Sequence, residues 1–401
     1  ALRGVDVRFV LGGHDERDFT SAHTVVASPA VAPGHPLLAA ARAAGARVTS
    51  ETALFLGACP ARVVLVTGTQ GKSSTAHAAH ALLAAAGVSA HLGGNIGRSL
   101  LGALATLDED DVVVLELSSY QLESLPPAGE LNPRTAAIGV VNVLADHLER
   151  HGNIASYEAA KRRILELVGD DSWVVLNGQD ERLGRWDAPR GRVVRYGLGE
   201  GFELGLRAGR FVHGERALGA AGDVALPGDF QRSNVLCALG LALAAGAQPA
   251  ALARALPGLT GLEHRLQDLG VHAGHRVVDN GVSTTPDSTL SAVLALEAPL
   301  CLLVGGQSKS LPLDELAARS KGRVRRVVAF GASAAELAAP FRATGLEALA
   351  CARLEDAVAL AYARMQPGEV LLFSPAAASF DAFRNFRDRA LALRAALPPK
   401  G

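Results

Sequence analysis

The stretch VLVTGTQGKSST, residues 64–75, decides the fold of the largest part of this chain. The apolar, β-branched run Val63–Thr67 predicts a buried strand, and the Ala-rich segment Ser73–Ala86 predicts a helix that ends at Gly87. The glycine loop between them turns backbone N–H groups inward at the positive end of that helix. This order of elements is therefore typical of a site that cradles the β- and γ-phosphates of a nucleotide.

Two side chains in this loop suit a nucleotide bound with Mg²⁺. Lys72 would reach the phosphates, and the Ser73 hydroxyl would ligate the metal ion. The strict phosphate-loop pattern has a glycine five places before Gly71, where this chain has Val66, so the motif is a shortened variant. The loop alone leaves open a plain glycine turn in which Lys72 is a solvated surface charge.

The composition favours several domains and small ligands. A chain of 401 residues is too long for one ordinary core and predicts two or three domains. Its 39 basic and 40 acidic residues nearly balance, which argues against a nucleic acid or an acidic membrane as partner. We therefore expect small-molecule substrates, no nucleic acid, no membrane and a monomer.

The cysteines and the hydropathy pattern bear on the compartment. The chain has Cys59, Cys237, Cys301 and Cys351, which lie far apart among apolar or small residues and show no metal-ligand spacing. They predict buried thiols in a reducing compartment. No apolar stretch is long enough to cross a bilayer and no signal peptide is visible, so we expect a cytoplasmic protein.

Alternating patterns divide the chain into three predicted domains. Residues 1–60 predict short strands, one of them at 5–12, and helices, but lack the strand and glycine loop that open a nucleotide-binding sheet, so we expect a partial N-terminal domain. Residues 61–260 predict a mostly parallel sheet covered on both faces, and residues 261–401 a second doubly wound α/β domain. Expected details are a helix at 156–168 capped by Ser156, antiparallel strands between 190 and 223, and a helix at 233–245.

Further polar residues follow two strands of the middle domain. Glu116 ends the strand that begins at Val112, and Asp146 and His147 follow the strand 136–143. Ligands of parallel sheets bind at the carboxyl ends of the strands, so these residues join the glycine loop in a predicted site for ATP and Mg²⁺. Each alone is also compatible with a structural role. Lys161, beside two arginines, is by its local sequence a residue of a solvated helix face.

Several motifs together carry a family resemblance over about residues 28–389. They are TGTQGKSS, GGNIG, LELSSYQLE, NVLADHLERH, AAKRRI, GLEHR, GGQSKS and SPAAASFDAFRNF. The chain resembles the Mur ligase superfamily, and LELSSYQLE and SPAAASFDAFRNF are closest to its branch that joins D-glutamate to UDP-N-acetylmuramoyl-L-alanine. The resemblance implies three α/β domains with a central P-loop ATPase-like sheet and a C-terminal Rossmann-like domain. It also implies a reaction: ATP phosphorylates the acceptor carboxylate, and the amine of glutamate displaces the phosphate.

The resemblance also implies the site residues. ATP would contact Gly68, Thr69, Gly71, Lys72, Ser73, Ser74, Asn234 and Arg265. Mg²⁺ would be ligated by Ser73, Glu116 and His147. The implied catalytic residues are Lys72, His147 and Lys161, the last matching a carbamylated lysine of the family. Ser28 and Asn95 would contact the UDP-muramoyl acceptor, and Thr284, Lys309, Ser379 and Phe386 would form the glutamate pocket.

One stretch departs from the family pattern. The usual motif Asp-Ser-Lys-Ala-Thr-Asn is replaced from Asn280 to Thr285, so that an acid becomes Asn280 and a lysine becomes Val282. The change puts a ribose contact in doubt and removes a positive charge near the glutamate pocket. The Thr-Thr-Pro sequence here also resembles that of relatives that add L-glutamate. We expect D-glutamate as the amino-acid substrate. Three alternatives stay open: a related ligase that adds L-glutamate, a folylpolyglutamate synthetase-like ligase and a non-catalytic nucleotide-binding scaffold.

Overall fold

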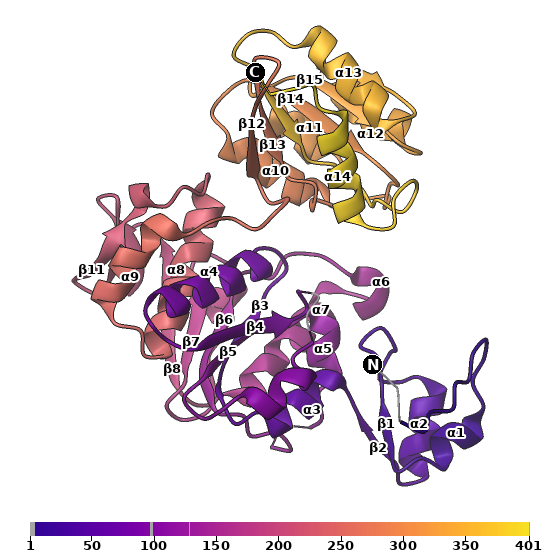
Figure 1. Cartoon of the computed structure of the whole chain (residues 1–401), viewed down its shortest axis with the longest axis vertical. Helices are drawn as coiled ribbons and strands as arrows, with labels where there is room; N and C mark the ends of the chain where they lie inside the picture. Colours follow the sequence, from indigo (N-terminus) through magenta and orange to yellow (C-terminus); the bar gives the residue numbers. More distant parts are fainter. Residues whose placement is uncertain (1–4, 97–98, 128, 401) are drawn as a thin grey trace. The chain divides into compact units, whose positions relative to one another are not determined.

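The computed structural model describes residues 5–96, 99–127 and 129–400, which form two compact units (Figure 1). The first unit comprises Ala1–Gly219 and Val235–Ala255, and the second comprises Ala220–Asn234 and Leu256–Gly401. The expected boundary at residue 60 lies inside the first unit, so the division into three domains stays a prediction. Residues 1–4 and Gly97, the last residue of GGNIG, lie outside the described residues.

A nine-stranded sheet forms the centre of the first unit, in the order β11-β10-β9-β8-β7-β6-β3-β5-β4. β3 (Arg62–Thr67) lies between β5 (Val112–Glu116) and β6 (Thr135–Val140) and is parallel to both. The parallel set continues through β4 (Ala90–Gly94), β7 (Trp173–Asn177) and β8 (Arg192–Leu198). Both faces are buried, since Val63, Val64, Leu65 and Val66 are all fully inaccessible to solvent.

Helices cover the two faces of this sheet. On one face, α3 (Glu51–Ala58), α5 (Ser119–Glu123) and α7 (Ile154–Arg162) share a core with β3, β5 and β6. α4 (Lys72–Ala85) packs on β3, β4 and β5, and on α9 (Pro249–Ala255). Gly139 on β6 lets α8 (Asp229–Ala244) approach, because a Cβ there would lie 3.0 Å from the Cys237 Sγ and from Leu241. The predicted doubly covered parallel sheet is confirmed.

Four local predictions in the first unit need correction. α7 is capped by Asn153 instead of Ser156, because the Asn153 Oδ1 accepts the Ser156 N–H at 2.9 Å, and it becomes a 3₁₀ helix at Arg163–Leu167. α8 begins at Asp229, four residues before the expected start. The expected strand at 5–12 has no regular structure. β9 (Leu204–Arg207) and β10 (Arg210–His213) are antiparallel as expected, but β9 is parallel to β8; β11 (Arg216–Ala220) follows at the sheet edge.

The N-terminal part of the first unit is small. It contains α1 (Glu16–Thr20), α2 (Pro36–Ala43) and a two-stranded parallel sheet of β1 (Thr24–Val26) and β2 (Arg47–Thr49). The alternating segment before α1 pairs with neither strand, and Phe9 and Leu11 are 67% and 86% exposed. An alternating pattern makes a strand only where a partner supplies hydrogen bonds, which explains the missing strand at 5–12.

The second unit is a separate α/β layer structure. Its six strands follow the order β12-β13-β17-β14-β15-β16, all parallel except β12, which runs antiparallel to β13. They are β12 (Gln267–His272), β13 (His275–Asp279), β14 (Leu300–Gly305), β15 (Val324–Phe330), β16 (Glu347–Ala350) and β17 (Val370–Phe373). One core contains α10 (Pro286–Ala295), α11 (Asp314–Ser320) and α12 (Ala334–Ala343), and the other contains α13 (Leu354–Arg364) and α14 (Phe386–Ala396). The predicted doubly wound domain is confirmed.

The structure also bears on the predicted buried thiols and on the expectation of no membrane-spanning segment. All four cysteines are free thiols; Cys237 and Cys301 are buried, whereas Cys59 and Cys351 are only half-buried. Burial raises the pKa of the Cys237 and Cys301 thiols to about 12. Among the described residues, no helix has both the length and the apolar character needed to cross a membrane.

Candidate active site

The predicted glycine loop connects β3 to α4. Gly68 has φ +154° and Gly71 has φ +81°, values that side-chain-bearing residues rarely adopt. A Cβ on Gly68 would also lie 3.1 Å from the Cβ of Val141. Gly71 occupies the N-cap of α4, a helix of 14 residues whose first N–H groups have no partners within the helix. The loop and this helix end together form an anion site of the predicted kind.

Asn142 holds this loop in place. Its Oδ1 accepts hydrogen bonds from the Thr69 N–H at 3.0 Å and the Gln70 N–H at 2.9 Å, and its Nδ2 donates to the Gln70 carbonyl at 3.1 Å. The Thr69 hydroxyl accepts further bonds from the Leu144 N–H at 2.9 Å and the Tyr157 hydroxyl at 3.2 Å. The sequence motifs alone do not predict this role of Asn142. Its position just after β6, at the carboxyl edge of the sheet, was the available signal.

Two lysines donate to carbonyls of the same loop from different environments. Lys72 is half-buried, and its Nζ donates to the Thr69 carbonyl at 2.9 Å. Lys161 is 1% exposed; its Nζ donates to the Gly68 carbonyl at 2.6 Å and lies 4.4 Å from the centre of the Tyr157 ring. Burial lowers the pKa of Lys161 well below its ordinary 10.5, and the charge of Lys72 lowers that pKa further. The solvated helix face suggested by the local sequence is therefore wrong.

Glu116 provides an open carboxylate oxygen beside the loop. It pairs in register with Val66 of β3 and is only 2% exposed. Its Oε1 accepts a hydrogen bond from the Asn95 Nδ2 at 3.0 Å, whereas its Oε2 has no hydrogen-bond partner among the described residues. A buried carboxylate oxygen without a partner is costly, and a hard cation would satisfy it. The residues present therefore fit Mg²⁺.

The residues near Glu116 suggest a metal ion held by ligands of several chemical types. Among the described residues, no three or more His, Cys, Asp and Glu side chains are grouped so that they could hold a metal ion. An ion at Glu116 would therefore need hydroxyl and phosphate oxygens as well, which Mg²⁺ accepts. The half-buried Ser73, at the first turn of α4, is the predicted hydroxyl ligand.

His147 lies in the loop that follows β6. It has φ +51° and precedes α6 (Leu148–His151). Its imidazole side chain is 45% exposed, with the Asp146 Oδ2 3.7 Å from Nε2 and the Glu149 Oε1 3.5 Å from Nδ1. The Tyr120 hydroxyl lies 3.4 Å from the same Nδ1. The phosphate loop, Glu116 and His147 thus follow three neighbouring parallel strands at one edge of the sheet, as the sequence predicts.

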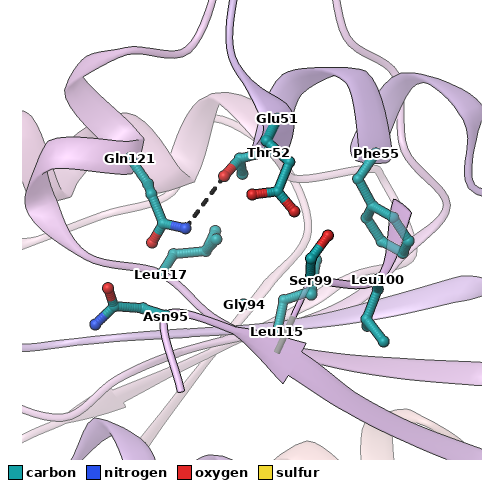
Figure 2. A pocket seen from close by; sticks show the side chains of 10 residues that line it. All are labelled: Glu51, Thr52, Phe55, Gly94, Asn95, Ser99, Leu100, Leu115, Leu117 and Gln121. Carbon is teal, nitrogen blue, oxygen red and sulfur yellow. Dashed lines mark hydrogen bonds between the residues drawn. The ribbon is translucent and has the colours of Figure 1, made fainter. Parts of the chain in front are cut away.

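A cavity of about 280 Å³ lies next to Glu116 and is shown in Figure 2. Asn95 lines it and also donates to the Glu116 carboxylate, so the cavity and the predicted metal site share a wall. The side chains of Glu51 and Ser99 point into the same space, and the Gln121 amide donates to the Thr52 hydroxyl at 3.2 Å (Figure 2). Five of the ten lining residues are polar or charged and four are apolar, so the cavity can offer both hydrogen bonds and apolar contact to a small polar ligand.

The second unit brings together most of the predicted glutamate residues. Thr284, Lys309 and Ser379 follow β13, β14 and β17, which are neighbours in the sheet. The Lys309 Nζ donates to the Thr284 hydroxyl at 3.5 Å. Ser379 is 3% exposed, and Phe386 begins α14 with its ring centre 6.2 Å from that of His264.

Arg389 fixes the three loops of this pocket and was missed in the sequence. The side chain is fully buried; its Nη1 donates to the carbonyls of Gly305 at 3.0 Å and Ala377 at 2.9 Å. Its Nη2 donates to the Gly281 carbonyl at 3.2 Å. Burial lowers the pKa of Arg389 to about 10, so it keeps its charge at neutral pH. The sequence gives no signal for this role, because the three carbonyls belong to distant segments.

The Asn280 side chain is used by the fold itself. It is 6% exposed; its Nδ2 donates to the Ser374 hydroxyl at 2.9 Å, and its Oδ1 accepts the Leu266 N–H at 3.3 Å. Ser374 in turn donates to the Thr289 hydroxyl at 2.9 Å, which lies 2.8 Å from the Ser283 hydroxyl. The departure from the family motif therefore forms a buried polar network.

Three other predicted residues are found in different parts of the chain. Asn234 belongs to the second unit and is 4% exposed; its Nδ2 donates to the Gln231 Oε1 at 3.2 Å. Arg265 also belongs to the second unit. Ser28 follows β1 in the first unit, is exposed, and accepts the Ala30 N–H with its hydroxyl at 3.3 Å.

The phosphate loop, the open carboxylate and the doubly wound sheets together define a nucleotide-dependent ligase of the Mur type. The Mur ligase middle domain family model matches residues 66–242. The UDP-N-acetylmuramoylalanine–D-glutamate ligase of Roseiflexus sp. is 34% identical, with 98% of this chain and 88% of the relative covered. The enzyme of the same name from Salmonella typhimurium is 36% identical, with 94% and 85% covered.

The chain therefore belongs to the Mur ligase superfamily and, within it, to the family of UDP-N-acetylmuramoylalanine–D-glutamate ligases, MurD. The solved structures support the same fold. The MurF ligase of Thermotoga maritima in complex with ADP matches with a TM-score of 0.64 and 18% identity, covering 94% of this chain and 97% of that one.

Proposed function

We propose that this chain joins D-glutamate to UDP-N-acetylmuramoyl-L-alanine with hydrolysis of ATP, as a cytoplasmic monomer that makes a peptidoglycan precursor. The observation that carries this proposal is the buried Glu116 Oε2 beside a glycine loop, which has no hydrogen-bond partner within residues 5–96, 99–127 and 129–400, in a chain of the MurD family. A buried carboxylate that keeps one oxygen free is poorly explained by stability alone. It is explained by a metal nucleotide that binds there.

The chemistry requires a good leaving group on the acceptor carboxylate. Bound MgATP supplies a phosphoryl group: the carboxylate oxygen attacks the γ-phosphorus, ADP leaves, and an acyl phosphate results. The glutamate nitrogen then attacks the acyl carbon, inorganic phosphate leaves with the bridging oxygen, and the nitrogen loses a proton. The chain contributes positioning and charge neutralisation to both steps.

The residues of the first unit take distinct roles in this proposal. Lys72 would neutralise the β- and γ-phosphates, and Ser73 and Glu116 would hold Mg²⁺. Lys161 is placed for carbamylation, which requires a neutral amine, and burial lowers its pKa in the required direction. A carbamate on Lys161 would keep an N–H on the Nζ that now donates to the Gly68 carbonyl at 2.6 Å, and its anionic oxygens would be available to cations. His147 would help to hold a second metal ion, which would supply charge neutralisation for the acyl phosphate.

The residues of the second unit recognise the amino acid. Lys309 pairs with a carboxylate of glutamate, and Thr284 and Ser379 supply hydroxyls. Phe386 forms an apolar wall. Arg389 holds the three loops together because its guanidinium donates to one carbonyl in or next to each loop, those of Gly281, Gly305 and Ala377.

A second candidate is the same ligase with L-glutamate as its substrate. The observation that favours it is the loop after β13, where Asn280 is buried in a hydroxyl network and Val282 carries no charge. This loop carries Thr284, so a change in its conformation alters the shape of the pocket that distinguishes the two enantiomers.

Phosphate release from ATP tests both candidates. The assay uses UDP-N-acetylmuramoyl-L-alanine with D-glutamate, with L-glutamate, or with no amino acid. Release with D-glutamate alone supports the first candidate, and release with L-glutamate alone supports the second. Absence of release with both, from a chain that binds ATP, contradicts both and leaves the scaffold interpretation. Competition by a folate as acceptor would indicate a folylpolyglutamate synthetase-like ligase.

A further inference from the structure

The loop that carries Ser28 is held by an arginine from a distant element. Arg150, on α6, donates from Nη1 to the Ala30 carbonyl at 2.9 Å. Its Nη2 donates to the carbonyls of Pro29 at 3.4 Å and Val31 at 3.3 Å. Three consecutive carbonyls of this loop therefore point toward one guanidinium, and these hydrogen bonds fix the backbone conformation next to Ser28.

The guanidinium is itself fixed from the other side. Glu123, the last residue of α5, accepts a hydrogen bond from the Arg150 Nε with its Oε2 at 3.1 Å, and the same oxygen forms an ion pair with Nη2 at 3.1 Å. The Tyr120 ring centre lies 4.8 Å from the guanidinium carbon, within cation–π range. The side chain of Arg150 is only 13% exposed, so these contacts are formed largely out of water.

Arg150 also lies one helical turn after the predicted metal residue. Its backbone N–H donates to the His147 carbonyl at 3.1 Å. Tyr120, which packs against the guanidinium, places its hydroxyl 3.4 Å from the His147 Nδ1. The loop around Ser28 and the loop around His147 thus share one set of contacts, although they are far apart in the sequence.

Side-chain packing alone holds the Ser28 loop only loosely. A cavity of about 370 Å³ separates it from the segment after α5 and is lined by Val31 and Pro33 on one side and Leu125 and Pro126 on the other. Ser28 and Ala30 are exposed. Because close apolar contact is incomplete here, the hydrogen bonds of Arg150 carry much of the positioning.

We propose that Arg150 is a positioning residue for the UDP-muramoyl acceptor. It aligns the Ser28 loop with the loop of His147, so that an acceptor bound at Ser28 presents its carboxylate on the His147 side of the site. Arg150 touches no reacting atom in this role. The proposal rests on the proposed ligase function, and it assigns to this side chain the affinity for the acceptor and not the affinity for ATP.

The test compares Michaelis constants for the two substrates in Arg150→Met and Arg150→Lys. Arg150→Met should raise the KM for UDP-N-acetylmuramoyl-L-alanine about tenfold or more, because several charge-assisted hydrogen bonds are lost, and should change the KM for ATP less than about twofold. Arg150→Lys should give an intermediate value, since an ammonium lacks the planar fork that reaches three carbonyls and a carboxylate together. Glu123→Gln should shift the acceptor KM in the same direction by less.

Arg195→Met is a matched control. Arg195 on β8 also holds loop carbonyls, those of Leu183 at 3.0 Å and Trp186 at 2.9 Å, but in a part of the sheet without predicted substrate residues. It should lower the melting temperature and leave the acceptor KM unchanged. The proposal would be overturned if Arg150→Lys and Glu123→Gln each kept the wild-type KM for the acceptor. It would also be overturned if the KM for ATP rose as much as the KM for the acceptor. An inactive wild-type chain would instead refute the ligase function on which the proposal rests.

Discussion

The phosphate loop and the loop after β13 use their polar side chains in opposite ways. Around the phosphate loop, Glu116 is buried but its Oε2 has no hydrogen-bond partner among the residues that the structure describes, and Gly71 at the N-cap of α4 has no side chain to cap the helix. After β13, the buried Asn280 side chain donates to Ser374, which follows β17, and Ser374 donates to Thr289 of α10, so each of these side chains has hydrogen-bond partners.

The difference separates residues kept for a ligand from residues used by the fold. A polar group that is buried and unsatisfied destabilises the chain, so its presence at Glu116 indicates a partner that comes from outside. A satisfied buried network stabilises a loop and leaves little capacity for a ligand. The phosphate loop keeps Lys72 and Ser73, whereas the loop after β13 has Asn280 and Val282 where the family motif has an acid and a lysine, in agreement with this distinction.

The largest expected effect is that of Lys72→Ala. Without the ammonium group the β- and γ-phosphates lose their neutralising charge, and we expect phosphate release to fall about a thousandfold. Steady-state release with saturating substrates measures it. Lys321→Ala removes an exposed lysine at the end of α11 and is the control, which should keep the wild-type rate. Near-normal turnover of Lys72→Ala would mean that the phosphate loop is not kept for a nucleotide, and its contrast with the loop after β13 would no longer hold.

Lys161→Ala should lower turnover about a hundredfold, because the site loses the anion that a carbamate would supply. Short carboxylates such as acetate, added to the variant, should restore part of the activity. Chloride at the same ionic strength is the control and should restore none. Full activity in the variant without additive would show that the buried amine serves only to hold the Gly68 carbonyl.

Asn280→Asp restores the acid of the family motif and should destabilise the chain by about 2 kcal/mol. The carboxylate would be buried and could no longer donate to the Ser374 hydroxyl. Urea unfolding measures the loss, and the KM for ATP should not improve. A stable variant with a lower KM for ATP would mean that this loop has kept its capacity for ribose and that the contrast with the phosphate loop is wrong.

A smaller effect concerns the pH dependence of stability. The pKa of Lys161 is lowered in the folded chain, so between that value and the ordinary 10.5 the unfolded chain binds a proton that the folded chain does not. Its contribution therefore makes the free energy of unfolding rise with pH in that window, by at most about 1.4 kcal/mol per pH unit. Lys161→Met should flatten the rise in urea titrations made without carbon dioxide. Parallel wild-type and variant curves would contradict a depressed pKa.

The sequence predicted the sheets well because burial on both faces leaves continuous apolar runs. Val63–Thr67, Val112–Glu116 and the strands of the second unit could be recognised in this way. Local polar choices were harder: Ser156 and Asn153 are both good caps, and only the docked helix decides between them.

The environment of individual side chains was the least predictable part of the site. The burial of Lys161 depends on which face of a short helix meets the phosphate loop, and AAKRRI does not encode that. Arg150 binds a carbonyl 120 residues away, and Arg389 one 108 residues away. Such contacts arise from the topology of the chain, so no local pattern reports them.

The measurement that tests the account most directly follows the oxygen of the acceptor carboxylate. The protein is incubated with ATP, D-glutamate and UDP-N-acetylmuramoyl-L-alanine labelled with ¹⁸O in both carboxylate oxygens. The ¹⁸O content of the released phosphate is then determined by mass spectrometry. The account predicts one labelled oxygen in each phosphate, because the bridging oxygen of the acyl phosphate leaves with phosphorus. Amide product accompanied by unlabelled phosphate would contradict it.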